Sequence, residues 1–198
     1  MGTRNITRVI SGGELKVCQY GQWDGYPTSA GFRVAGFVRR TPENEMVGRL
    51  EHVTLVTAKS GDGVMATGAP MFDEYNDIGR DVRWQALTSC DATANTKQLA
   101  DRYGIDLVNR YFIASRDTGC DVLDIIFRET GDLVLWTTDY LVGNDGDWQI
   151  EAVWELNYDN RSMTGIWRGK RRMWTFDRLL GFSSDKLRNE MRGFEREA

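Results

Sequence analysis

The sequence predicts an α+β fold in which an N-terminal hairpin and a C-terminal meander build one antiparallel sheet. Helices from the middle of the chain are expected to pack on that sheet. Two observations lead to this prediction: β-rich segments occupy both ends of the chain, and apolar residues recur at helical spacing between them. A chain of 198 residues can bury one sizeable core, so we expect a single domain over 1–198.

The first elements are a hairpin, a loop and a short helix. Residues 3–10 and 15–23 are rich in β-forming side chains, and Gly12-Gly13 between them suits a tight turn. The segment 24–31 contains two glycines and Pro27, which favours a loop. Residues 32–40 then carry apolar side chains at helical spacing, and Pro42 follows as a stop.

The middle of the chain is predicted to be mostly helical. The segment 41–70 is expected to be an insertion carrying a second hairpin, with strands at 50–58 and 63–67. Apolar residues at helical spacing then predict three helices. They cover residues 71–89, 96–114 and 118–131.

The C-terminal third is predicted to return to β structure. Strand-like runs at 133–140, 148–156 and 162–167 are separated by turns rich in Asn, Asp and Gly, which predicts an antiparallel meander. In the middle run Trp154 and Leu156 share one face and Glu155 lies on the other, so one face should be buried and the other largely wet. A short polar helix is expected over 184–197.

Charge is unevenly distributed along the chain. The net charge is −4, but residues 161–198 contain 10 basic and 5 acidic side chains, which makes this region +5 and the remainder −9. Either these opposite charges pair with each other within the fold, or the basic C-terminal region forms a local site for anions. Of the 25 basic residues 20 are arginine, the side chain suited to phosphate and carboxylate groups.

Cysteine and histidine usage argues against a metal site. The three cysteines, Cys18, Cys90 and Cys120, are far apart, and His52 is the only histidine, so we expect no disulfide framework, no metal and no cofactor. No apolar run is long enough to span a bilayer, and the first residues lack the core of a signal peptide. These features predict a cytoplasmic protein without a membrane partner.

The densest group of functional side chains lies at the end of the second strand. Tyr20, Gln22, Trp23, Asp24 and Tyr26 combine rings, an amide and a carboxylate within seven positions. Such a surface can stack and hydrogen-bond a polar ring, so we interpret it as a binding site for a small polar, nucleotide-like ligand. The alternative interpretation is a structural turn with Asp24-Gly25 at its tip.

Two residues at the start of the first strand extend this site. Arg4 and Asn5 should lie beside the Asp24 loop because hairpin strands are adjacent, and Arg4 could pair with Asp24 or with an anionic ligand. An alternative function is a hydrolase that uses Asp24 as general base, which requires a second catalytic group that the sequence does not identify.

A second alternative is a nucleic-acid or protein-contact adaptor that uses residues 167–174. Four basic side chains lie there between two tryptophans, a combination that attracts phosphates and stacks bases. The candidate contacts are Trp167, Arg168, Lys170, Arg171, Arg172 and Trp174.

The N-terminal segment resembles a family of uncharacterised proteins from bacteriophages and bacteria. The resemblance is carried by Thr3-Arg4-Asn5 and by the run Gln19–Pro27 with its Trp-Asp-Gly-Tyr-Pro core, and it extends more loosely to 77–82, 118–123 and 151–159. The segment 41–70 and the basic stretch after 167 depart from it. The resemblance implies a phage or mobile-element accessory protein, located in the host cytosol if phage-encoded, and implies no particular activity.

Overall fold

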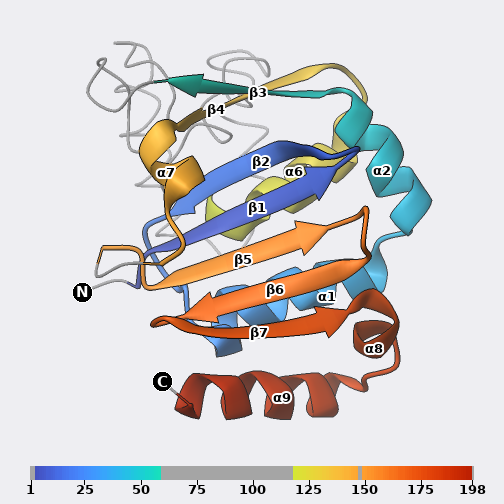
Figure 1. Cartoon of the computed structure of the whole chain (residues 1–198). Helices are drawn as coiled ribbons and strands as arrows, with labels where there is room; N and C mark the ends of the chain where they lie inside the picture. Colours follow the sequence, from blue (N-terminus) through green and yellow to red (C-terminus); the bar gives the residue numbers. More distant parts are fainter. Residues whose placement is uncertain (1–2, 59–117, 147–148, 198) are drawn as a thin grey trace, which may run out of the picture.

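The computed structural model describes residues 3–58, 118–146 and 149–197, and its main feature is a five-stranded sheet in the order β2-β1-β5-β6-β7 (Figure 1). The strands are β1 (Asn5–Ser11), β2 (Glu14–Gly21), β5 (Ala152–Asn157), β6 (Ser162–Trp167) and β7 (Lys170–Thr175). The α+β prediction is confirmed, because an N-terminal hairpin and a C-terminal meander build this sheet. The two units join through a parallel pairing of β1 with β5, while the other neighbours are antiparallel.

The composition of the meander differs from the prediction. The run 133–140 does not join it: β4 (Leu133–Thr138) pairs in parallel with β3 (Val53–Ala58) in a separate two-stranded sheet. The third meander strand is instead β7, which follows β6 after a two-residue turn at Arg168-Gly169. Both turn residues have positive φ, as a tight hairpin requires.

The start of the predicted insertion 41–70 is also different. A helix, α2 (Glu43–Glu51), begins in this segment and includes the first two residues of the predicted strand 50–58, and β3 follows it after His52. The predicted hairpin partner at 63–67 and the predicted helices over 71–89 and 96–114 lie outside the described residues. The later helical prediction is confirmed by η2 (Gly119–Asp121), a 3₁₀ turn, and α6 (Val122–Arg128).

Helices cover the rear face of the main sheet as it is drawn in Figure 1, where α1 and α6 lie behind the strands. A π-helical turn, η1 (Pro27–Gly31), leads into α1 (Phe32–Arg40), and α8 (Phe176–Leu180) and α9 (Ser184–Arg196) follow β7. The three apolar residues of the polar helix α9 are all fully buried in the main hydrophobic core, which lies between these helices and the sheet: Leu187, Met191 and Phe194. None of the helices in the described ranges is long and apolar enough to cross a membrane.

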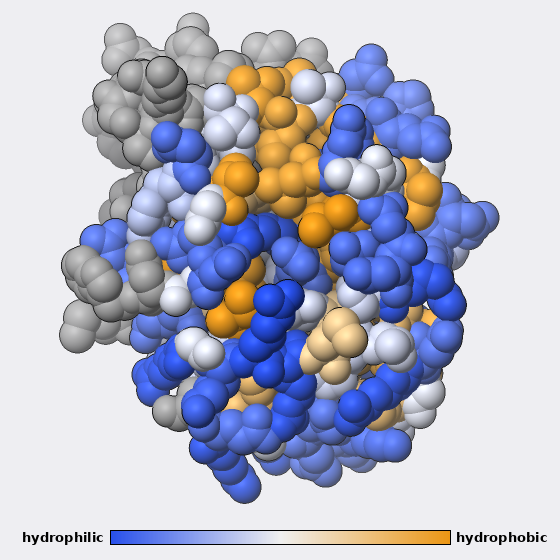
Figure 2. Space-filling view, in the orientation of Figure 1, coloured by the Kyte–Doolittle hydropathy of each residue, from blue (hydrophilic) through white to orange (hydrophobic). Residues whose placement is uncertain are grey.

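The front face of the sheet is only partly exposed to solvent. A smaller hydrophobic cluster that includes Ile6 and Val153 lies there under α7 (Asp139–Gly143), so both faces of β5 carry buried residues. Figure 2 shows hydrophilic residues over most of the lower part of this face and hydrophobic residues gathered toward β3 and β4.

A buried arginine attaches α7 to the sheet. Nη2 of Arg8, in the interior strand β1, donates to the carbonyl oxygens of Leu141 (2.8 Å) and Val142 (2.9 Å), and Nη1 pairs with Asp145 at 3.0 Å. A guanidinium satisfies the otherwise unpaired carbonyls at a helix C-terminus and complements its partial negative charge. Arg8 therefore has a structural role that strand alternation alone did not indicate.

Candidate functional site

Hydrogen bonds from two strands hold the backbone of the loop that follows β2. The amide of Gly25 donates to the carbonyl of Thr3 (3.0 Å), and the side-chain amide of Asn5 donates to the carbonyl of Trp23 (3.1 Å). From β5, the indole N–H of Trp154 donates to the carbonyl of Gly25 (3.1 Å). The loop is thus fastened to β1 and β5 through its main chain.

Close packing explains the glycines of this segment. A Cβ atom at Gly25 would lie 2.9 Å from the carbonyl oxygen of Thr3, and one at Gly31 would lie 2.6 Å from the ring of Trp154. Asp24 adopts a positive φ of 57°, a conformation that Asp tolerates better than most residues. The structural interpretation of Asp24-Gly25 therefore accounts for the backbone of the turn.

The side chains of the predicted site divide into two groups. Asn5 and Tyr20 are only 1% and 7% exposed, whereas Trp23 is 53% exposed, Tyr26 is 37% exposed and Asp24 lies in solvent. The loop therefore combines a fixed backbone with two large exposed rings and a carboxylate.

The structure does not bring all predicted contacts to one surface. Tyr20 belongs to the front cluster beneath α7, and its hydroxyl donates to Oε1 of Gln22 at 2.7 Å. Tyr26 packs instead against Trp167, with ring centroids 5.5 Å apart, and Trp167 belongs to the core of the rear face. Tyr20 and Gln22 are therefore separated from Tyr26.

Among the described residues, the predicted ion pair between Arg4 and Asp24 is not formed. Nη1 of Arg4 donates to the carbonyl of Gln149 at 3.4 Å, and no ion pair between Arg4 and Asp24 occurs in the described part of the chain. The guanidinium of Arg168 instead lies 4.8 Å from the ring centroid of Trp167, the ring against which Tyr26 packs. Trp167 thus contacts both Tyr26 of the loop and Arg168 of the basic segment.

Most of the basic segment 167–174 contributes to the fold. Both tryptophans are buried and neither offers a free face to a base, while Arg172 pairs with Glu190 and Glu197 of the C-terminal region. Lys170 and Arg171 are exposed on β7, an edge strand of the sheet, where charged side chains discourage pairing with another chain. The positive charge of this segment is thus partly neutralised within the fold.

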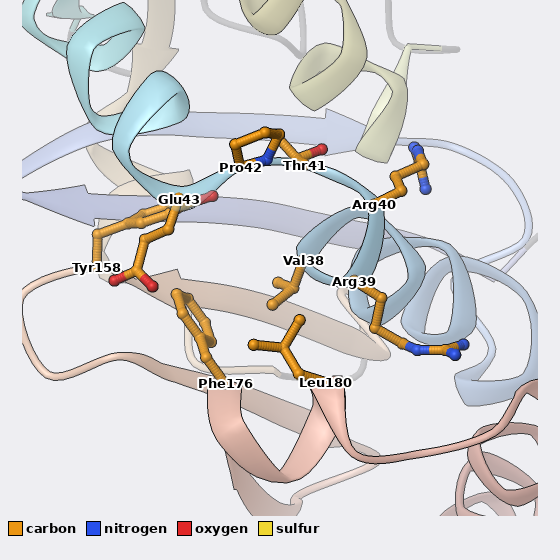
Figure 3. Close-up of a pocket in the computed structure, with 9 residues that line it drawn as sticks. All are labelled: Val38, Arg39, Arg40, Thr41, Pro42, Glu43, Tyr158, Phe176 and Leu180. Carbon is orange, nitrogen blue, oxygen red and sulfur yellow. The ribbon is translucent and has the colours of Figure 1, made fainter.

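A pocket lies at the opposite end of β5 from the loop. It has a volume of about 360 Å³ and is bounded by the end of α1, the start of α2, α8 and the turn after β5 (Figure 3). Sequence reasoning missed it, because its walls come from segments that have no common motif.

Comparison of the chain with protein-family models, with curated proteins and with solved structures gives no significant match. No group of three or more metal-binding side chains occurs among the residues that the structure describes.

Proposed function

We propose that the protein is a binding module for a small, nucleotide-like ligand, a polar ring with an anionic group. The proposed contacts are Trp23, Asp24 and Tyr26, with Arg168 at the edge of the site. The observation that carries the proposal is the exposure of both rings on a backbone held by hydrogen bonds from β1 and β5.

Rigidity is what distinguishes this surface from an ordinary loop with exposed aromatic residues. Ordering a mobile loop on binding opposes association, whereas a loop already fixed in the free protein avoids that loss of entropy. Trp and Tyr offer large contact areas with few rotatable bonds, and each stacked base contributes about 1–3 kcal/mol.

The charged groups suit a ligand with a phosphate. Arg168 and Glu151 lie 3.8 Å apart and are partly exposed, so this ion pair is weak and can give way to a phosphate group. The carboxylate of Asp24 can accept hydrogen bonds from an amino or sugar hydroxyl group. The further proposal of a phage accessory role rests on the resemblance of the Trp-Asp-Gly-Tyr-Pro segment.

The test is a thermal-shift and fluorescence titration with a panel of nucleoside mono-, di- and triphosphates, together with mass spectrometry of the denatured protein for a co-purified small molecule. A ligand at about 100 times its Kd should stabilise the fold by about 2.7 kcal/mol. Trp23→Ala should weaken binding by about tenfold or more, because one stacking face is lost.

Met173→Ala is the matched control, since Met173 is also an exposed large side chain but lies on β7. Equal affinity in Trp23→Ala and Met173→Ala would contradict the proposal, as would no bound molecule and no stabilisation across the panel. The hydrolase alternative predicts that the unaltered protein turns over a substrate and that Asp24→Asn does not. The adaptor alternative requires binding to single-stranded nucleic acid that weakens steeply with salt.

A further inference from the structure

The pocket at the far end of β5 has an apolar floor. Val38 and Phe176 are buried there, while Leu180 is 51% exposed at the mouth. Figure 3 shows these three side chains pointing toward a common space. Tyr158 packs edge-on against Phe176 with ring centroids 5.3 Å apart, which holds both rings in place as one wall.

Tyr158 supplies a polar atom at this wall that no other described residue binds. The residue is only 8% exposed and lines the pocket, yet its hydroxyl makes no hydrogen bond with any residue in the described ranges. The hydroxyl oxygen is not one of the sealed polar atoms without a partner, so it is open to solvent on the pocket side. The hydroxyl is therefore placed to bond something that enters the pocket.

Burial raises the pKa of Tyr158, and the nearby carboxylate of Glu43 raises it further. The phenol therefore stays neutral at physiological pH and keeps its proton. It can donate a hydrogen bond to an oxygen atom of a ligand.

Among the described residues that line the pocket, Arg39 is the basic residue outside any ion pair. Arg40 is paired with Asp124 at 2.7 Å, and Arg161 is shared between two carboxylates, Glu43 at 3.0 Å and Asp177 at 2.9 Å. Arg39 lines the pocket and has no ion pair with any residue that the structure describes; Figure 3 shows its side chain extending at the outer edge, on the side of Leu180 away from Tyr158. A guanidinium without a partner is a recognition group for a carboxylate.

We propose that this pocket binds a small carboxylic acid whose body is a single aromatic ring or a branched aliphatic chain. The body would lie on Val38, Phe176 and Leu180, the carboxylate would pair with Arg39, and the hydroxyl of Tyr158 would donate to a ligand oxygen. A volume of about 360 Å³ is near the lower end for ligand pockets, which suits one ring rather than a dinucleotide. This site is separate from the loop site and does not depend on it.

The experiment compares three probes that differ only in their polar end: 3-phenylpropanoate, 3-phenylpropan-1-ol and 3-phenylpropylamine. Binding is measured by ligand-observed NMR and by chemical-shift changes of the labelled protein. We expect the acid to bind more tightly than the alcohol and the amine to bind most weakly. The shift changes should be centred on α1, α8 and Tyr158.

Two variants test the named groups. Arg39→Gln should weaken the acid about tenfold or more and leave the alcohol unchanged, because a hydrogen bond to a charged group is lost. Arg171→Gln, a change to an exposed arginine on β7, is the control and should alter neither probe. Tyr158→Phe should weaken the acid a few-fold without lowering the melting temperature, since its hydroxyl supports no other described residue.

The proposal is overturned if no probe binds, if acid and alcohol bind equally, or if Arg39→Gln keeps the preference for the acid. It is also overturned if Trp23→Ala abolishes binding of the acid, which would place the probe in the loop site. Absence of nucleotide binding at the loop would not change the binding of the acid to this pocket, so the two proposals can fail independently.

Discussion

Replacing Gly31 by Ala is expected to destabilise the protein because the backbone there touches a buried indole. Trp154 is fully buried between Gly31 and Gly165, where added Cβ atoms would lie 2.6 Å and 2.5 Å from its ring. The ring is fully buried and in close contact at both positions, so it has little room to shift. Overpacking of this kind costs about 1–3 kcal/mol, and the confinement of the ring places Gly31→Ala at about 3 kcal/mol.

Conformational entropy offsets part of this cost. Gly31 has φ −58° and ψ −45°, which Ala adopts without strain, so the substitution gains about 1 kcal/mol from a less flexible unfolded chain. The expected net loss is about 2 kcal/mol. Gly48→Ala in α2 is the matched control, because no atom lies within 4 Å of its Cβ position and Ala should stabilise that helix by about 0.5–1 kcal/mol.

Urea unfolding followed by tryptophan fluorescence measures both variants. Gly31→Ala should lower the midpoint and Gly48→Ala should raise it, with the slope of the transition unchanged. Equal stability of Gly31→Ala and Gly48→Ala would show that the backbone of Gly31 does not pack closely against the Trp154 ring. It would also contradict the conclusion that this contact helps to hold the loop in place.

Two further changes probe other parts of the fold. Arg8→Lys should lower the free energy of unfolding in urea by about 2–3 kcal/mol and increase amide hydrogen exchange in α7, because one ammonium group cannot replace the bonds of a guanidinium to the carbonyls at the end of that helix. The control Arg171→Lys should change neither quantity. Equal stability of the two variants would contradict the role of Arg8. The raised pKa of Tyr158 means that the folded protein keeps a proton that the unfolded chain releases above about pH 10, so this stabilisation is present below pH 10 and is lost as pH rises further. Melting temperatures from pH 9 to 11 should therefore fall less steeply for Tyr158→Phe than for the unaltered protein, and parallel curves would refute the assignment.

Local signals in the sequence identified several elements correctly. The N-terminal hairpin, α1 and the C-terminal helix follow from turn residues and periodicity that lie within one segment. The run 133–140 was assigned to the wrong sheet, because strand propensity does not specify a partner and β4 pairs with a strand about 80 residues earlier in the chain. The basic character of 170–175 concealed an edge strand, although Arg168-Gly169 is a two-residue turn that could have indicated the hairpin.

The arrangement of the loop after β2 could be predicted from the sequence only in part. Its aromatic and acidic residues are adjacent in the chain, so their composition was visible, and Trp23 and Tyr26 are indeed exposed. No sequence signal linked Arg168 to the loop, because its connection runs through the packing of Trp167 against Tyr26, whereas the role of Arg4 toward an anion stays a prediction.

By itself the sequence determined where strands, turns and the loop occur, since backbone preferences and side-chain periodicity act over a few residues. Tertiary structure alone decided the parallel pairing of β1 with β5, the burial of Arg8 against α7 and the pocket around Tyr158. Each of these depends on which distant segments share one core, and burial, hydrogen-bond satisfaction and charge pairing are settled only when those segments pack together.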